Sequence, residues 1–253
     1  MELQYNWFPA LVTVGSIIAL TVVLRLILFS IPALAKTRAE DKAKNKEKFK
    51  KHEDRYRRRV PLSQKIGLSF NLFFFLAILP FIVTFDAQPV WKILLLCVVV
   101  LMVYDFFYYL MHRFLFHGSG YFLRVHGVHH QARSRVSSVD SFLLHPTEIF
   151  MGIALFYLTT VSIVLLTGEP FHAATIVICS VIYTQLNQMN HARIDLDTFP
   201  WRTVNWIALR HDAHHLGMTR GNYATITLFY DWLFGTLERH PLEDQQAGVP
   251  SNK

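Results

Sequence analysis

The stretch HGVHH at residues 126–130 is matched in pattern by HDAHH at residues 211–215. Both copies place histidines at positions i, i+3 and i+4, which share one face of a helix. The chain has 13 histidines in 253 residues, so two copies of this pattern would rarely arise by chance. Neutral imidazole is the side chain that most often binds metal ions. The repeat therefore predicts two helical segments that face each other across one or two ions.

Three further histidines lie close to these motifs. His112 and His191 each follow an apolar run, and His117 comes five residues after His112. His112 and His117 would lie about 140° apart on a regular α-helix. We therefore expect the helix to end or bend between them, or the two residues to serve different ions. The predicted ligand set is His112, His117, His126, His129, His130, His191, His211, His214 and His215.

The size and chemistry of this set limit the kind of metal site. A structural zinc site uses four ligands, so nine imidazoles suit two ions better than one. An all-nitrogen set is compatible with iron, zinc, copper or nickel. Two metal ions at a membrane surface favour redox chemistry, although ligand spacing alone does not exclude two zinc ions.

Two other polar residues are candidates for supporting roles. Asp105 lies seven residues before His112, on nearly the same helical face. It either accepts a hydrogen bond from a ligating imidazole or is a membrane-buried acid paired with Arg or Tyr. His145, in the segment HPTE, is a further ligand, a residue of the site wall or a helix cap. The remaining histidines are expected outside the site: His52 and His240 in solvent, and His172 at headgroup level.

The apolar residues make up 52% of the chain and gather in runs. Runs of about 17 to 25 apolar residues are long enough to cross a bilayer as helices. Five runs meet this length: 7–29, 66–85, 90–111, 149–167 and 171–189. The short connections DAQP and GEP contain proline and predict tight helical hairpins.

The net positive charge of the chain comes from residues 36–59. This segment holds 12 Lys and Arg against 5 Asp and Glu, a net charge of +7, which equals the charge of the whole chain. The positive-inside rule places it in the cytoplasm, with the N-terminus outside and residues 112–148 and 190–253 inside. All nine predicted ligands then lie on the cytoplasmic side. The sequence thus predicts an all-α fold: a multi-span transmembrane helical bundle of about five spans, whose helical cytoplasmic cap carries a histidine-rich dimetal site.

The basic segment has two further possible roles. It can hold anionic lipid headgroups, because it lies next to the predicted membrane surface. Nucleic-acid binding is not expected, because the segment is tethered at the membrane and offers only Phe49 and Tyr56 for base stacking.

Several separate motifs occur in a characteristic order and spacing. They are Asp105, Tyr108-Tyr109, His112-Arg113, His117, HGVHH, LHPTE at 144–148, His191, HDAHH and NYATITLFYDWLFGTLE at 222–238. Over about residues 100–240 this set resembles the fatty acid hydroxylase/sterol desaturase superfamily. Two positions depart from the family pattern: Tyr230 replaces the usual Trp, and Asn187 stands where some members have a histidine. No HPGG motif of a fused cytochrome b5 is present.

The resemblance implies two iron ions held by the nine histidines, and O₂-dependent hydroxylation of an unactivated C–H bond of a lipid: a sterol, a fatty acyl chain or a related molecule. It also implies a separate electron donor, such as a cytochrome b5- or ferredoxin-type carrier. Desaturation by the same chemistry is the alternative. A membrane metal transporter fits less well, because the spans offer only Asp105 as a site. The expected organisation is 1–60 for the anchor helix and basic loop, 61–241 for the hydroxylase-like domain, and 242–253 for a disordered tail.

Overall fold

The computed structural model describes residues 4–132, 136–192, 194, 196 and 198–246. Within these residues, 4 helical stretches are long and apolar enough to cross a membrane. They are α1 (Trp7–Ser30); α3 (Glu53–Phe73) continued by η1 (Phe74–Ile78) and α4 (Leu79–Ile82); α5 (Val90–Leu110) continued by η2 (Met111–Phe116); and α7 (Pro146–Thr167). The predicted all-α, multi-span membrane class is confirmed.

The fifth predicted span is shorter than expected. Its apolar run begins at residue 171, but Phe171 and His172 form strand β2, which pairs in parallel with β1 (Val83–Thr84). Helix α8 (Ala173–Met189) therefore has 17 residues. It nevertheless packs against α1 and α5 within the bundle.

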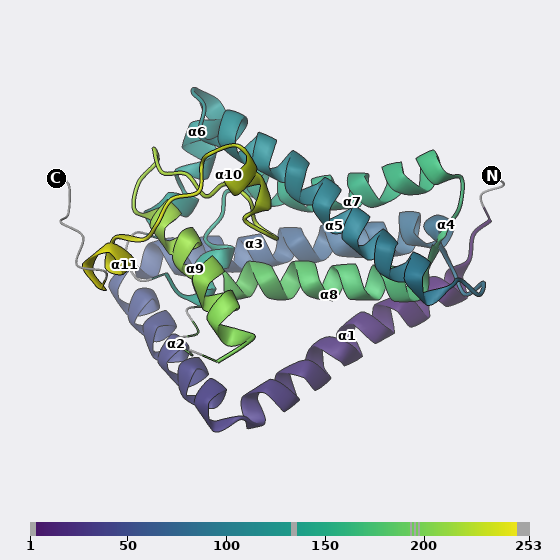
Figure 1. The fold of residues 1–253 in the computed structure, drawn as a ribbon, viewed down its shortest axis with the longest axis horizontal. Coiled ribbons are helices and arrows are strands. Elements are labelled where there is room, and N and C mark those ends of the chain that lie inside the picture. The colour runs from purple at the N-terminus through teal and green to yellow at the C-terminus, as the bar shows by residue number, and fades with distance from the viewer. Residues whose placement is uncertain (1–3, 133–135, 193, 195, 197, 247–253) are drawn as a thin grey trace.

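The bundle is built from α3, α5, α7 and α8, which run side by side, while α1 leaves it obliquely (Figure 1). Its core contains fully buried apolar side chains such as Val100 and Val164. Its outer surface is equally apolar, because Leu94, Val98 and Leu166 are 54%, 58% and 86% exposed. A surface of this kind is matched by lipid tails rather than by water.

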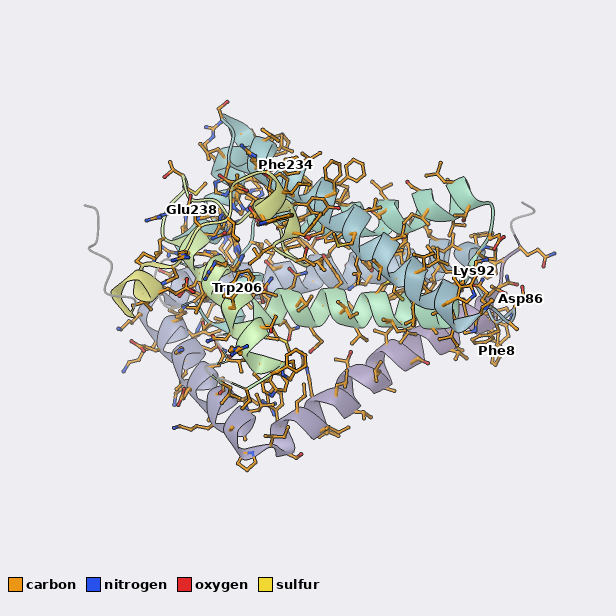
Figure 2. The ribbon with its side chains drawn as sticks, in the orientation of Figure 1. Phe8, Asp86, Lys92, Trp206, Phe234 and Glu238 are labelled. Atoms are coloured by element: carbon orange, nitrogen blue, oxygen red, sulfur yellow. The ribbon has the colours of Figure 1, made fainter. Side chains whose placement is uncertain are left out.

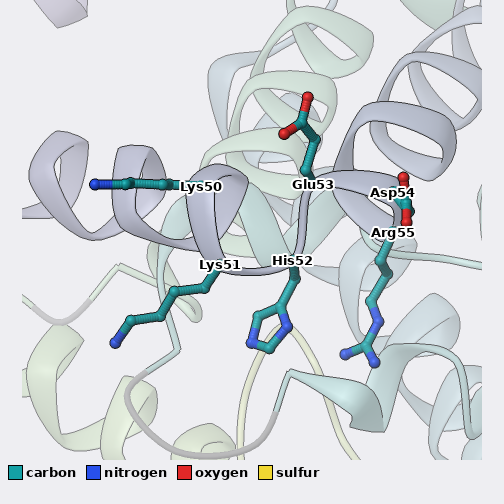
Figure 3. A pocket seen from close by; sticks show the side chains of 6 residues that line it. All are labelled: Lys50, Lys51, His52, Glu53, Asp54 and Arg55. Atoms are coloured by element: carbon teal, nitrogen blue, oxygen red, sulfur yellow. The ribbon is translucent and has the colours of Figure 1, made fainter.

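The basic segment, predicted as the connection between the first two spans, is helical. Helix α2 (Pro32–Lys51) covers most of it, and α3 begins at Glu53. Ala, Lys, Glu and Arg are strong helix formers, and ion pairs four residues apart, such as Glu53–Arg57 at 2.9 Å, support the helices further. At the junction of α2 and α3, Lys51, His52 and Arg55 point to the same side (Figure 3).

Asp140 is one of the residues that fix the basic helices to the rest of the molecule. Lys48 forms an ion pair with the buried carboxylate of Asp140, and the hydroxyl of Tyr56 donates to the same carboxylate over 2.7 Å. Asp140 lies in the short helix η4 (Ser138–Phe142). The basic segment is therefore a packed part of the fold.

The remaining short elements gather at one end of the bundle, on the left in Figure 1. They are α6 (Tyr121–His126), η3 (His129–Gln131), η4, α9 (Trp201–His215), α10 (Phe229–Leu233) and α11 (Pro241–Gln246). Figure 2 shows Trp206, Phe234 and Glu238 at this end and Phe8, Asp86 and Lys92 at the other. The assignment of this end to the cytoplasm stays a prediction from the charge distribution.

The C-terminal segment differs from the expectation of a disordered tail from residue 242. Its first residues lie in α11, and Glu243 forms an ion pair with Arg210 of α9. His240 is only 6% exposed, so its predicted place in solvent is wrong. Its Nε2 lies 3.5 Å from a carboxylate oxygen of Asp212, which draws the ring inward. Residues 247–253 lie outside the described part of the chain.

Candidate metal centre

The structure brings all nine predicted histidines together in two adjacent groups. Within each group, one ring nitrogen of every histidine lies within 4.8 Å of the corresponding nitrogen of every other member. The five-histidine group consists of His112, His117, His126, His130 and His214. The four-histidine group consists of His129, His191, His211 and His215.

Each motif contributes histidines to both groups. His126 and His130 lie in the five-histidine group, whereas His129 between them lies in the other. HDAHH shows the reverse division, because His214 joins the five-histidine group and its neighbours join the four-histidine group. The three histidines of each motif are therefore divided between two groups. In HGVHH, α6 ends at His126, and His129 and His130 lie in the separate helix η3. In HDAHH all three lie in α9, where adjacent residues point about 100° apart, so positions i+3 and i+4 can serve different ions.

A π-helix explains how His112 and His117 reach the same group. The backbone N–H of His117 donates to the carbonyl of His112 over 3.0 Å, an i→i+5 bond that closes the wide turn of η2. Such a bond places residues five apart above one another, and π-turns of this kind are frequent at functional sites. The two ring centres lie 5.0 Å apart. The helix ends at Phe116, between the two histidines, as the spacing predicted, and its last turn is a π-helix.

Backbone carbonyls of one C-terminal loop orient three rings of the five-histidine group. In each case the Nδ1–H donates to a carbonyl oxygen, which leaves the lone pair of Nε2 directed into the group. The donor and acceptor pairs are His112 to Tyr223 (2.7 Å), His117 to Met218 (2.7 Å) and His214 to Gly221 (2.8 Å).

Glu148 orients a fourth ring. Its carboxylate lies 2.6 Å from Nδ1 of His126, and both side chains are buried. Glu148 belongs to the LHPTE motif, but the motif alone did not predict this role. The available signal was an acidic residue in the first turn of an apolar helix, where a carboxylate has no other obvious partner.

The Nε2 atoms of these four rings face one another in pairs. Nε2 of His112 lies 2.9 Å from Nε2 of His126, and Nε2 of His117 lies 3.2 Å from Nε2 of His214. The three rings bound to backbone carbonyls carry their proton on Nδ1, so the Nε2 atoms of His117 and His214 present lone pairs to one another, and that of His112 presents one toward His126. A cation between them removes this repulsion. Nitrogens about 2.1 Å from one ion and at right angles to each other lie about 3.0 Å apart, so the residues fit a metal ion.

Burial makes the histidines good ligands at neutral pH. His126 and His214 are fully buried and His215 is 1% exposed. Burial, followed by the proximity of other imidazoles, holds the pKa of His129, His211 and His215 well below the usual range. Burial also lowers the pKa of His214 to about 3. The rings are therefore neutral and able to donate lone pairs.

Among the described residues, no hydrogen bond joins Asp105 to an imidazole, an arginine or a tyrosine, the partners that the sequence suggested. Its side chain is fully buried and accepts hydrogen bonds from the backbone N–H groups of Thr225, Ile226 and Thr227, over 2.9, 2.8 and 3.0 Å. A carboxylate can satisfy its lone pairs with backbone donors from a distant loop, and nothing in the local sequence specifies that loop.

The other candidate residues lie around the two groups. His145 is the N-terminal cap of α7, because its Nδ1 accepts from the N–H of Thr147 over 3.2 Å. His172 caps α8 in the same way. Asn187 uses its backbone carbonyl to accept from Nδ1 of His191 over 3.0 Å. Neither His145 nor Asn187 is a member of the two groups.

Comparisons with known proteins agree with this geometry. The family model for fatty acid hydroxylase matches residues 97–236. A very-long-chain aldehyde decarbonylase of Oryza sativa subsp. indica is 34% identical over 140 residues, which are 52% of this chain and 48% of that protein. A methylsterol monooxygenase of Arabidopsis thaliana is 32% identical over 140 residues, with the same coverage of both chains.

A third relative, a cholesterol 25-hydroxylase-like protein of Danio rerio, is 33% identical over 142 residues, 53% of this chain and 47% of that protein. The chain spans about half the length of the curated relatives it matches. No solved structure is significantly similar to it. The family match covers more than half of the chain, including both histidine motifs and the loop that orients them. The chain therefore belongs to the fatty acid hydroxylase family.

Proposed function

We propose that this protein is a membrane-bound non-haem di-iron oxygenase that hydroxylates an unactivated C–H bond of a lipid. The proposal rests on two buried groups of histidines at the end of an apolar bundle, in which the Nε2 atoms face one another. Nine neutral imidazoles suit two redox-active ions better than one structural zinc ion. The named relatives, which act on sterols or long-chain aldehydes, support a lipid substrate.

The reaction consumes one O₂, two electrons and two protons, inserts one oxygen atom into the C–H bond and releases the other as water. Bound iron supplies the O₂ activation and the oxidising power for cleaving the C–H bond. The chain itself has three tasks. It fixes the imidazoles through their Nδ1 atoms, it excludes water by burying the rings, and it presents the site to a substrate that arrives from the bilayer.

The orientation follows from the basic helices. Residues 36–59 carry a net charge of +7, which supports a cytoplasmic position for them and for the metal groups. The N-terminus then lies outside. The two electrons come from a separate carrier of the cytochrome b5 or ferredoxin type, which reaches the groups from the cytoplasm.

Desaturation is the second candidate, because it begins with the same hydrogen abstraction. Lipid mass spectrometry of cells with and without the protein separates the two. A lipid that gains one oxygen atom supports hydroxylation, and one that loses two hydrogen atoms supports desaturation. The His214→Ala variant is the control for both. Purified protein that lacks iron after ferrous reconstitution, or that transports metal into vesicles, would refute the oxygenase proposal.

A further inference from the structure

Two buried carboxylates hold five consecutive backbone N–H groups in the C-terminal loop. Asp105 comes from α5 and Asp231 from α10, and both side chains are fully buried. Asp231 accepts from Tyr223 and Ala224, both over 2.8 Å, and Asp105 accepts from the next three residues. Residues 223–227 are thus bound to side chains at every N–H.

No basic side chain pairs with either carboxylate in the described residues. The remaining acceptor capacity is used by hydroxyl groups: Thr227 Oγ1 donates to Asp105 over 2.9 Å, and Thr236 Oγ1 donates to Asp231 over 2.7 Å. Hydrogen bonds to a buried carboxylate are charge-assisted and stronger than neutral ones. Loss of one carboxylate leaves several buried N–H groups without an acceptor, which is costly. These two residues therefore hold residues 223–227 in place, while Glu238 binds the N–H of Gly221 just before them.

The loop that they hold is the one that orients the imidazoles. Tyr223 links the two functions directly, because its N–H is bound by Asp231 and its carbonyl accepts from His112. Gly221 and Met218, just before it, accept from His214 and His117. A displaced loop would release three of the five rings at once.

The four-histidine group does not depend on this loop in the same way. The carbonyl that accepts from His191 belongs to Asn187 of helix α8, whose position is set by the helix itself. The loop touches the helices of this group without binding an imidazole. Thr225 Oγ1 donates to Asn187 Oδ1 over 3.3 Å, Nδ2 of Asn190 donates to the carbonyl of Thr225 over 2.9 Å, and Nδ2 of Asn222 donates to the carbonyl of Arg210 over 2.9 Å. Nδ1 of His129 and of His215 has no hydrogen-bond partner among the described residues.

We propose that Asp105 and Asp231 are positioning residues on which metal binding by the five-histidine group depends. Metal binding by the four-histidine group does not depend on them. The two aspartates act through residues 218–227 and touch no ligand themselves. The inference rests on the proposed function to the extent that both groups bind an ion.

Metal content and spectroscopy of the purified full chain test this inference. Asp105→Asn and Asp231→Asn are compared with His214→Ala, which removes a ligand of the five-histidine group, and with His211→Ala, which removes one of the other group. After ferrous reconstitution, iron per chain should fall from two to one in both aspartate variants. Their Mössbauer spectra should match that of His214→Ala and differ from that of His211→Ala.

Asp140→Asn is the matched control, because Asp140 is also fully buried and accepts a backbone N–H, that of Ser137, without contact to the loop. It should keep both ions. Thr227→Val covers the case in which an aspartate variant does not fold, because it removes only one hydrogen bond to Asp105. It should lower the iron affinity of the five-histidine group alone, by about 10- to 100-fold.

The outcomes separate this inference from the proposed function. Aspartate variants that keep two ions, or that lose iron equally from both groups, overturn the positioning role. A wild-type chain that binds no iron overturns the proposed function whatever the variants show.

Discussion

Nε2 of His130 and Nε2 of His214 lie 3.1 Å apart, although the two residues are separated by 84 positions and belong to different motifs. His129, next to His130, instead lies in the group that contains His215, and the centres of those two rings are 4.5 Å apart. Each group therefore needs both motifs, and neither motif can hold an ion in the observed arrangement alone.

Replacing one histidine of either group should abolish activity. We expect His129→Ala and His214→Ala each to lower bound metal and to eliminate product, because each removes a lone pair that faces its neighbours. His172→Ala should change neither quantity, since His172 only caps α8. Metal content and lipid product are the measurements. Full activity of the His129 variant would contradict the assignment of the site.

Removing the charge of Glu148 should weaken the five-histidine group. Glu148→Gln replaces a carboxylate by a neutral acceptor beside Nδ1 of His126. We therefore expect the affinity of the five-histidine group for its ion to fall about tenfold. Glu169→Gln is the control, because Glu169 is exposed and contacts Lys92 at the other end of the bundle. Titration with ferrous ion measures both variants, and equal affinities would show that Glu148 does not act on the site.

A methyl group at Gly221 should displace the loop that orients the rings. A Cβ there would lie 2.0 Å from the carbonyl oxygen of Thr236, which is backbone and cannot rotate away. Gly221→Ala should therefore lose the ion of the five-histidine group and unfold at lower temperature. Gly217→Ala lies in the same loop, and its Cβ would meet nothing closer than 3.9 Å. It should behave as wild type, and a similar loss in both variants would argue against the steric explanation.

His145→Ala distinguishes a helix cap from a tenth ligand. Loss of a capping side chain costs about 1 kcal/mol of stability, whereas loss of a ligand costs metal. We expect the free energy of unfolding to fall by this amount and the metal content to stay unchanged. His172→Ala, which removes the equivalent cap of α8, should show a similar decrease. Reduced metal in the His145 variant alone would make His145 a ligand.

The proposed orientation can be tested by labelling. The native Cys97 and Cys179 are buried, so they give little background. A membrane-impermeant maleimide applied to intact cells should label Asp86→Cys and spare Lys50→Cys, because both positions are exposed but lie at opposite ends of the bundle. After permeabilisation both should react. The reverse pattern would place the metal groups outside the cytoplasm.

The sequence contained enough information to identify the nine histidines and the membrane class. Ligand spacing and apolar run length are local properties, and both survive in the fold. The partition of the ligands was not predictable, because it depends on how His129 and His214 cross between two segments that are distant in sequence. The role of Asp105 was missed for the same reason, since its partners lie 120 to 122 residues away.

Two local structures were not specified by these arguments. The charge of residues 36–59 marked them as a connection between spans, and their helix propensity and ion pairs favour the helices observed. The spacing of His112 and His117 was judged against an α-helix and predicted an end or a bend between them. The helix does end at Phe116, but its last turn is a π-helix, which is rare enough that a spacing argument based on α-helices omits it.

The division of each motif between the two groups also sets an order in biosynthesis. When the ribosome has completed residue 200, the nascent chain carries four members of the five-histidine group but only two of the other. Neither group can be completed until HDAHH has been added, and the carboxylate of Asp231, which holds the orienting loop, is synthesised later still. Under the proposed function, iron can therefore complete the two groups only after Asp231 has been synthesised. A cell that produces this protein faster than it can supply iron would then accumulate membrane-inserted chains with unfilled groups of imidazoles.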